Sequence, residues 1–325
     1  MLFIDSEQIR ISMNNAAMEQ TPFFFIINYE MSDGLFIENP ASQNEVLFQF
    51  NNMGNKPSLQ NSSKRSELTA YPISLEEYCA KFEIVQQGLK SGDIDVVNLT
   101  ARTPVRTNLN CREIFLRSHS PYQVYIPGKF VCFSPERFVK IKNGRIWSNP
   151  MKGTIDASTP DAEQLILSDS KEIAEHTEIA KLIVEELKMV ASDVTIKRFR
   201  YIDQVKTHNK TLLQVSSEIE GVLPNDYISR IGDIVFSLLP AGSITGSPKT
   251  KAREYIRFAE VQPRGYYCGV AGYFDGETLD TAVLIRFIEI ENENMFFRSG
   301  GGVTRDSICI NEYQEVLQKI YLTLV

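Results

Sequence analysis

The chain has 325 residues, 43% of them hydrophobic, and a formal net charge of −7 at pH 7. This length allows a large core in one domain or two, and the negative charge argues against a nucleic-acid surface, which needs clustered lysine and arginine. The five cysteines are odd in number and lack CxxC spacing, which argues against a disulfide framework, and none of the three histidines has zinc-site spacing.

The N-terminal part of the chain contains no membrane signal. The longest early apolar run, 22–27, is too short to span a bilayer, and polar residues 5–15 do not resemble a signal peptide. The sequence therefore predicts a soluble cytoplasmic protein that binds neither membranes nor nucleic acids.

The first half of the chain is predicted to be rich in strands. Residues 22–50 alternate apolar and polar positions, so we expect the chain to open with strands, followed by a long polar loop over 51–67. Ser74, followed three residues later by Glu77, indicates the start of a helix over 74–91, which Gly88 and Gly92 close. Short strands are then expected over 94–101, 122–126, 129–133, 138–142 and 145–148.

The second half combines helices with a return to strands. Helices are expected over 160–192 with a break near Ser168, over 225–238, over 249–260 and from about 311. Strands are expected around 194–201, 211–219, 267–274, 279–290 and 295–298, the last followed by a glycine turn. Strands at both ends of a helical middle predict an α+β fold and no βαβ repeat. We interpret 1–325 as a single domain in which 1–70 is a short N-terminal strand region.

The stretch AGSITGSPKTKAREYI at 241–256 places a glycine-hinged Ser/Thr loop directly before an expected helix. The first N–H groups of a helix lack partners within it and carry partial positive charge, so such a loop can seat an anion. Gly242 and Gly246 allow close backbone approach, and Ser243, Thr245 and Lys249 add hydroxyl donors and a positive charge. The alternative is a plain cap and turn.

Two expected helices each carry glutamates three residues apart, Glu172 with Glu175 and Glu312 with Glu315. This spacing puts both members of a pair on one helix face. Four carboxylates that face one cavity suit a hard cation with oxygen ligands, and we expect Mg²⁺. Either pair taken alone is more often a solvated helix surface.

Several cationic side chains accompany the second pair. Glycines 300–302 precede it and predict close backbone approach, while Lys319 lies one turn beyond Glu315, where its ammonium suits a substrate carboxylate. Arg286 stands in the apolar run TAVLIRFIEI, so its partner is either a bound carboxylate or a structural ion pair. Lys152, in NPMKGT, is either a solvated loop lysine or, if its pKa is lowered, a nucleophile or base.

Taken together, the motifs resemble those of the chorismate-utilising enzymes, which include anthranilate synthase component I, aminodeoxychorismate synthase component I, and the isochorismate and salicylate synthases. The resemblance covers about 74–323 and rests on the blocks GDIDVVNLT, FSPERFV, NPMKGT, EIAEH, LQVSSEIEG, LPAGSITGSPKTKA, RGYYCGVAGY, AVLIRF, SGGGVTRDS and NEYQEVLQK. It implies antiparallel sheets that form a β-sandwich core surrounded by helices.

The resemblance also implies a ligand set. Mg²⁺ would be held by Glu172, Glu175, Glu312 and Glu315 and would bridge to the ring carboxylate of chorismate. Lys152, Glu172 and Glu315 would be catalytic. Further substrate contacts are implied for Thr154, Ser243, Thr245, Tyr267, Arg286, Gly301, Gly302 and Lys319.

Two positions distinguish the members of this family. Isochorismate and salicylate synthases share a water-activating lysine where this chain has Val96, whereas a lysine similar in placement to Lys152 acts in aminodeoxychorismate synthases as a nucleophile. The resemblance therefore favours Mg²⁺-dependent amination of chorismate at carbon 4, toward p-aminobenzoate and folate. The sequence shows no glutaminase motif, so the nitrogen is expected from free ammonia or from a separate glutamine amidotransferase.

One segment departs from the family pattern. Members usually have an aspartate and then Arg-Asn-Asp where this chain has Lys181 and Val184-Glu185-Glu186, and the sequence supplies no physical reason. Two alternatives to the favoured function stay open: anthranilate synthase component I, and a degenerate member that binds chorismate or a partner without turnover.

Overall fold

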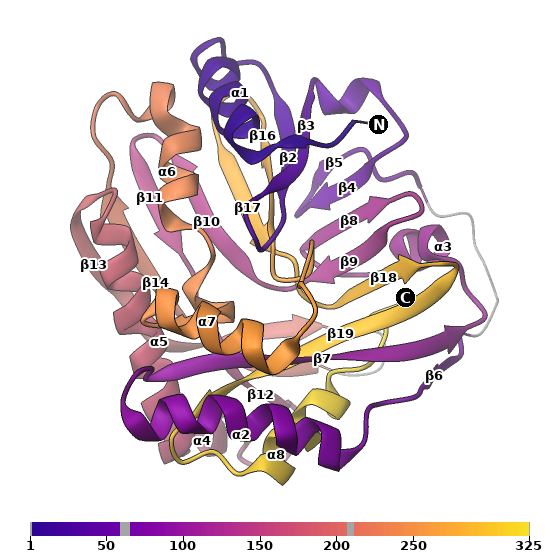
Figure 1. The fold of residues 1–325 in the computed structure, drawn as a ribbon. Helices are drawn as coiled ribbons and strands as arrows, with labels where there is room; N and C mark the ends of the chain where they lie inside the picture. The colour runs from indigo at the N-terminus through magenta and orange to yellow at the C-terminus, as the bar shows by residue number, and fades with distance from the viewer. Residues whose placement is uncertain (1, 59–65, 207–210, 325) are drawn as a thin grey trace.

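The computed structural model describes residues 2–58, 66–206 and 211–324, and it contains two large sheets (Figure 1). Every strand pair in the described ranges is antiparallel. The first sheet has ten strands, ordered β1 (Ile4–Asp5), β3 (Asp33–Glu38), β2 (Phe23–Ile27), β16 (Val270–Phe274), β17 (Leu279–Val283), β10 (Arg137–Lys142), β11 (Arg145–Ser148), β14 (Thr211–Val222) and β12 (Met151–Asp156), with β13 (Ser192–Lys206) also paired to β14.

The second sheet has nine strands. They are ordered β15 (Gly246–Ser247), β7 (Val96–Thr107), β19 (Asn294–Thr304), β18 (Phe287–Glu291), β9 (Phe130–Ser134), β8 (Tyr122–Ile126), β4 (Leu47–Phe50) and β5 (Met53–Gly54), with β6 (Leu68–Ala70) beside β7. Phe24 of β2 stacks on Phe48 of β4 with ring centroids 4.6 Å apart, which joins the two sheets through their inner faces. All five residues of β2 are buried, as expected of a strand covered on both faces.

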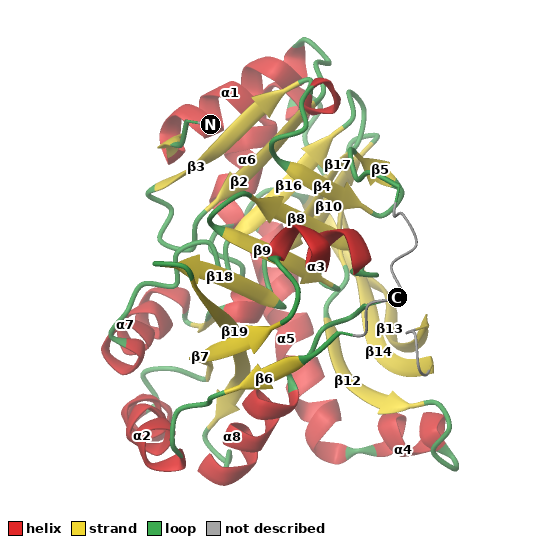
Figure 2. Cartoon of the chain, turned by 90° about the vertical axis from the view of Figure 1, so that its right-hand side faces the viewer, coloured by secondary structure: helices red, strands yellow, loops and turns green. Residues whose placement is uncertain are grey.

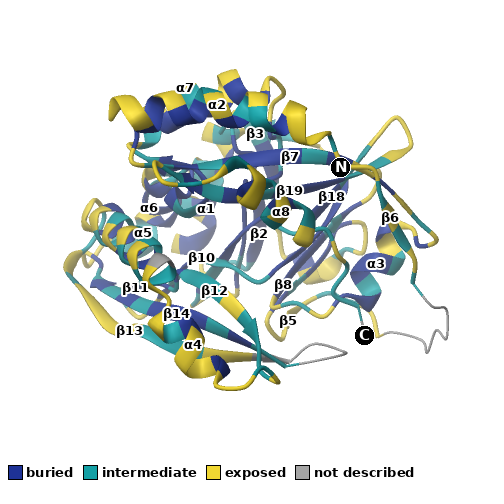
Figure 3. Cartoon of the chain, turned by 90° about the horizontal axis from the view of Figure 1, so that it is seen from below, coloured by how far each residue is buried: buried dark blue, intermediate teal, exposed yellow. Residues whose placement is uncertain are grey.

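Eight α-helices of the described ranges surround the sheets. They are α1 (Ser6–Met18), α2 (Leu75–Ser91), α3 (Cys111–Arg117), α4 (Ala162–Ser168), α5 (Ser170–Lys188), α6 (Ile231–Leu238), α7 (Lys249–Glu260) and α8 (Cys309–Gln318). Helix α2 packs against α7, α8 and β7, α5 packs on β13 and β14, and α3 covers β8 and β9 (Figure 2). Seen from below, α2 and α7 turn exposed outer faces to solvent above the buried strand β7 (Figure 3).

Much of the predicted architecture is confirmed. The fold is α+β, with antiparallel sheets enclosed by helices. Helix α2 begins with the capping box of Ser74 and Glu77 and ends at Gly92, whose φ is +81°. The helical middle breaks at Asp169, next to the predicted position. No helix in these ranges combines the length and apolarity that a membrane span requires.

Three expectations about local structure are wrong. Strands do lie within 22–50, but a helix that was not expected, α1, precedes them after the two-residue β1; it is capped by Asp5 and buried through Ile9, Met13, Ala16 and Ala17. The strand expected over 279–290 is two strands in different sheets, because the chain turns at Arg286, whose φ is +54°. The expected glycine turn after residue 298 is instead the continuation of β19 to Thr304.

The expectation that the cysteines form no disulfide is also wrong for one pair, because Cys79 and Cys309 are bonded. The two residues are 230 positions apart, and only the folded chain brings them together. Part of the loop expected over 51–67 lies outside the described residues.

Candidate active site

A cavity of about 780 Å³ opens where α5 faces the start of β7, β12 and the loop before α7. Four of the predicted site residues line it: Lys152, Glu175, Ser243 and Gly302. Val96, the first residue of β7, lines the same cavity. Its volume is in the range of pockets that enclose small molecules.

Lys152 lies among the carboxylates at one end of this cavity. Its Nζ is 2.7 Å from Oε2 of Glu175. Burial alone would lower the pKa of Lys152, but the charges of Glu175, Glu315 and Glu172 outweigh burial and hold the pKa above its ordinary value. A nucleophilic lysine needs a lowered pKa, and the pKa of Lys152 is raised. Lys152 therefore stays an ammonium as long as the neighbouring carboxylates are charged.

Glycines bring both glutamate pairs close to the backbone of the sheets. A Cβ placed on Gly153 of β12 would lie 3.1 Å from Glu172 Oε2, and a Cβ on Gly301 of β19 would lie 3.2 Å from Glu315 Oε1. The same position on Gly301 is 3.6 Å from Glu312 Oε2. The glycines therefore allow another group to approach the backbone closely, as predicted. The approaching groups are glutamate carboxylates, and the glycines lie within strands.

The donor chemistry of the two pairs fits a hard cation. Glu172 Oε2 is buried and accepts no hydrogen bond from the described residues, and burial raises the pKa of this carboxyl. Carboxylate oxygens are the ligands that Mg²⁺ prefers. Within the described ranges, however, no group of three or more acidic, histidine or cysteine side chains is arranged to hold a metal ion. Lysines partner the glutamates instead: Lys152 pairs with Glu175, and Lys319 pairs with Glu315.

Lys319 contacts Glu315, and Arg286 contacts Lys319. Lys319 Nζ is 2.7 Å from Glu315 Oε1 and donates to the carbonyl of Gly300 at 2.7 Å. Arg286 donates to the carbonyl of Lys319 at 3.2 Å, and its guanidinium lies 4.8 Å from the ring centroid of Tyr321. No carboxylate of the described residues forms an ion pair with Arg286, so the structural ion pair considered from the sequence is not seen.

Glu136 is a cavity residue that sequence reasoning did not single out. It lines the cavity and accepts a hydrogen bond from Ser243 Oγ at 2.6 Å. Burial raises the pKa of Glu136, although the Ser243 bond and the charges of Lys319 and Lys152 oppose the shift. A buried carboxylic acid in a cavity is a candidate proton donor. Its only sequence signal was its place in the block FSPERFV.

The loop before α7 is arranged differently from the expected anion seat. Lys249 turns away, with its Nζ 2.9 Å from Glu186 Oε1 and 2.7 Å from the carbonyl of Leu238. Thr245 is buried and donates to the carbonyl of Ala241 at 2.8 Å. Glu186 occupies the aspartate position of the family triplet, so its carboxylate now has a structural explanation as the partner of Lys249.

Two further predicted contacts also lie away from the cavity lining. Thr154 is exposed on β12 opposite Gln214. Tyr267 is buried in the core, with its ring centroid 5.9 Å from that of Phe287. The resemblance supplied both residues, and neither strand pairing nor burial was visible in the motifs.

A buried arginine that the sequence analysis passed over supports the loop from behind. Arg264 is 1% exposed and is bonded to both carboxylate oxygens of Glu260, four residues earlier. It also donates to the carbonyls of Ile244, at 2.8 Å, and Asn98, at 2.6 Å. Arg264 thereby ties the segment that carries Ser243 to α7 and β7.

The titratable residues of the cavity lining are predominantly acidic. Six acids line it against three bases, which are Lys152, Lys181 and Arg305. The acids are Asp95, Glu136, Glu175, Glu178, Glu185 and Asp306. Lys181 and Glu185 are among the positions that depart from the family pattern, and they lie at this cavity on α5.

An antiparallel sandwich with a carboxylate-lined cavity is the architecture the resemblance implied, and comparison with known proteins gives the same result. The model of the chorismate binding enzyme family matches residues 16–324. The chain therefore belongs to the chorismate binding enzymes.

Relatives carry different names. The chain is 42% identical over 314 residues to an "Uncharacterized PabA-like protein" of Haemophilus influenzae, covering 96% of this chain and 95% of the relative. It is 31% identical over 258 residues to aminodeoxychorismate synthase component 1 of Salmonella typhimurium, covering 75% of this chain and 56% of the relative. It is 32% identical over 278 residues to anthranilate synthase component 1 of Acetivibrio thermocellus, covering 80% and 55%. The chain thus spans little more than half the length of these two synthases.

A solved structure supports the fold. The Bacillus anthracis structure described as a putative 2,3-dihydroxybenzoate-specific isochorismate synthase superposes with a TM-score of 0.74 over 98% of this chain and 90% of that one. The two sequences are 17% identical, so the likeness concerns the fold alone.

Proposed function

We propose that the protein aminates chorismate at carbon 4 with ammonia, in a Mg²⁺-dependent reaction that yields 4-amino-4-deoxychorismate. The observation that carries this proposal is the pair of discriminating residues in one cavity. Lys152 lies there as a potential nucleophile, and Val96, which has no group able to activate water, lies there in place of a lysine. This combination favours an amine over water as the attacking group.

Glu172, Glu175, Glu312 and Glu315 would hold the cation, whose role when bound is to stabilise negative charge on the ring carboxylate and on the departing hydroxyl. The carboxylates hold Lys152 as an ammonium, and a bound cation would offset their charge and so lower the pKa of Lys152. Lys152 must then lose a proton, and Glu175, 2.7 Å away, is placed to take it. The Lys152 amine then forms a bond to carbon 2 while the bond from carbon 4 to its hydroxyl breaks. Glu136 protonates this hydroxyl, which leaves as water.

Ammonia completes the exchange. It forms a bond to carbon 4 while the bond from carbon 2 to Lys152 breaks, and the electron pair returns to the lysine nitrogen. One proton of the new ammonium group restores the Glu136 acid, and the proton held by Glu175 returns to the released Lys152 amine, so atoms and charges balance. We propose that a separate glutamine amidotransferase supplies the ammonia in the cytoplasm, and that the product enters p-aminobenzoate and folate synthesis.

The test is mass analysis of the product formed from chorismate, ammonium chloride and MgCl₂. We expect aminodeoxychorismate, which keeps the enolpyruvyl group, and we expect Lys152→Ala and Lys152→Arg to bind chorismate but to lose most product formation. Lys188→Ala is the matched control, because Lys188 makes an exposed ion pair on the same helix as Glu175. Near-normal turnover by Lys152→Arg would refute the proposal that Lys152 is the nucleophile.

The same assay decides the alternatives. Anthranilate with released pyruvate would identify an anthranilate synthase component I, a reading that the 32% identical relative keeps open. Chorismate that is bound but not consumed would identify a member without turnover.

A further inference from the structure

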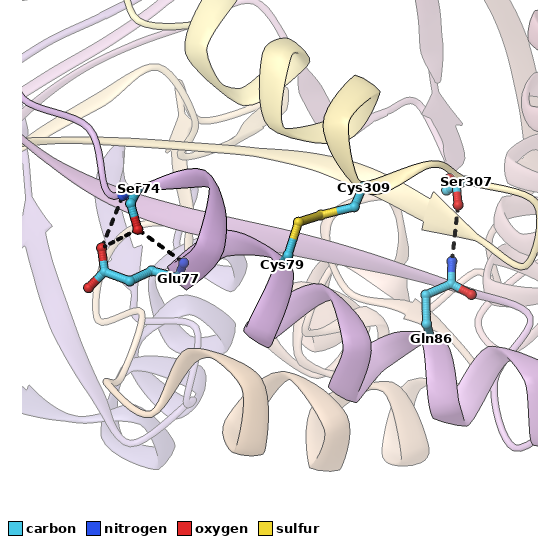
Figure 4. The surroundings of a disulfide bond; sticks show 6 residues. All are labelled: Ser74, Glu77, Cys79, Gln86, Ser307 and Cys309. Carbon is cyan, nitrogen blue, oxygen red and sulfur yellow. Dashed lines mark hydrogen bonds between the residues drawn. A yellow bond between two sulfur atoms is a disulfide. The ribbon is translucent and has the colours of Figure 1, made fainter.

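The Cys79–Cys309 disulfide links the candidate active site to a neighbouring helix (Figure 4). Cys79 lies on α2, and Cys309 is the first residue of α8, with the two Cα atoms 5.9 Å apart. Helix α8 also carries Glu312, one turn beyond the disulfide, and Glu315. The disulfide is therefore attached directly to the helix that holds one of the two glutamate pairs.

The two linked helices are anchored unequally. In α2, Ser74 Oγ accepts from the Glu77 N–H at 3.1 Å (Figure 4). Four apolar side chains of α2, Tyr78, Phe82, Val85 and Leu89, are buried. Helix α8 has 10 residues, no side-chain hydrogen bond at its N-cap Ile308, and only Glu312 and Val316 buried. Helices this short are marginal without tertiary support. Helix α8 thus depends on what holds it to the rest of the protein.

Helix α8 packs on β19 and α2, and the ring centroid of Tyr313 lies 5.4 Å from that of Tyr78. Gln86 of α2 donates to the carbonyl of Thr304 at 2.9 Å, just before the helix. Tyr313 donates to the carbonyl of Ile73 at 2.6 Å. Among these described contacts, the disulfide at Cys309 is the covalent restraint.

The disulfide is also the redox group that a reagent can reach. Cys79 and Cys309 are half-buried, whereas Cys111, Cys132 and Cys268 are buried thiols. Burial raises the pKa of Cys111 and of Cys268 to about 12, which suppresses their reactive thiolate forms. In a cytoplasmic protein, a disulfide is usually transient and serves catalysis or redox sensing.

We propose that Cys79 and Cys309 form a reversible thiol–disulfide site that reacts with a dithiol and controls the order of α8, and with it the positions of Glu312 and Glu315. One thiolate of the dithiol attacks a cysteine sulfur and breaks the disulfide, and its second thiol releases the mixed disulfide. The protein gains two electrons and two protons, and the dithiol becomes a cyclic disulfide. The consequence for metal binding and turnover rests on the function proposed above.

The experiment compares the full chain after treatment with dithiothreitol and after treatment with its oxidised cyclic form. Amide hydrogen exchange is followed by mass spectrometry, and free thiols are counted by alkylation under denaturing conditions. We expect reduction to speed exchange across 309–318 by about tenfold and to leave α3 unchanged. Cys79→Ser should show the fast exchange under both conditions, while Cys111→Ala, which alters a buried thiol outside the pair, should still respond to the dithiol.

Two results would overturn the proposal: equal exchange of α8 in both redox states, or alkylation of both Cys79 and Cys309 after oxidation. These readouts need no chorismate. A redox-dependent α8 in a chain that never consumes chorismate would support the switch and refute only the proposed function.

Discussion

Replacing Arg264 with methionine tests how the core holds the loop that carries Ser243. Arg264 donates to Glu260 at 2.9 and 2.6 Å, and it also bonds the carbonyls of Ile244 and Asn98. Methionine keeps much of the side-chain volume and donates nothing. The Glu260 carboxylate, 6% exposed, would keep the Thr100 N–H at 2.9 Å but lose its charged partner.

The loss of stability in Arg264→Met follows from the burial of the ion pair between Arg264 and Glu260. Removing one partner of a buried ion pair costs about 3–5 kcal/mol, because the other charge stays uncompensated. At roughly 2 °C per kcal/mol for a chain of this size, the midpoint of thermal unfolding should fall by about 6–10 °C. Adding Glu260→Gln removes the remaining charge and keeps an acceptor for Thr100, so the double variant should regain a large part of the loss.

The assay is thermal unfolding by circular dichroism of the wild type, both single variants and the double variant. Chorismate KM is measured in parallel, because movement of Ile244 displaces its neighbour Ser243. The reasoning is refuted if Arg264→Met melts within about 1 °C of the wild type, or if the double variant is no more stable than Arg264→Met.

Three further residues of the candidate active site give predictions. Burial raises the pKa of Glu136 above its ordinary value of 4.5, so ionisation of this carboxyl destabilises the fold as the pH rises past that value. Glu136→Gln should therefore unfold at a higher temperature than the wild type at pH 8 but not at pH 4. Equal unfolding midpoints of the two proteins at both pH values would contradict this. The same variant should lose about 10²–10⁴-fold in kcat if Glu136 is the acid. Glu315→Gln should abolish turnover and weaken Mg²⁺ binding measured by calorimetry while leaving the fold intact, whereas undiminished wild-type turnover in excess EDTA would exclude the metal. Arg286→Lys should raise the chorismate KM by an amount equivalent to about 2–3 kcal/mol with unchanged thermal stability, and the reverse pattern would assign Arg286 a structural role.

The sequence was sufficient to predict features that depend on interactions between residues close together in the chain. The capping box at Ser74 follows from side-chain chemistry within one helical turn. The bounds of α7, Lys249–Glu260, equal the predicted ones, although no side chain caps the start of this helix. The glutamate pairs could be assigned to common helix faces from their spacing alone. That they meet glycines of β12 and β19 required the tertiary fold.

Features that depend on distant partners could not be predicted. Arg286 lies in an unbroken apolar run, yet the chain changes sheets there, which only strand pairing reveals. Arg264 is buried although its segment looks polar, because Glu260 and two backbone carbonyls accept hydrogen bonds from its guanidinium. Glu136 drew no attention because its burial beside Ser243 is a property of the folded cavity.

The acidic lining of the cavity has a consequence for the sequence of binding events. With Glu136 as a neutral acid, the lining has five carboxylates against three bases, so it repels an approaching dianion and attracts a divalent cation. Under the proposed function, cation loading would precede chorismate loading, and product would depart before the cation. The free cation concentration would then set the fraction of molecules able to accept substrate, so the protein would follow compulsory-order kinetics with the metal as first ligand.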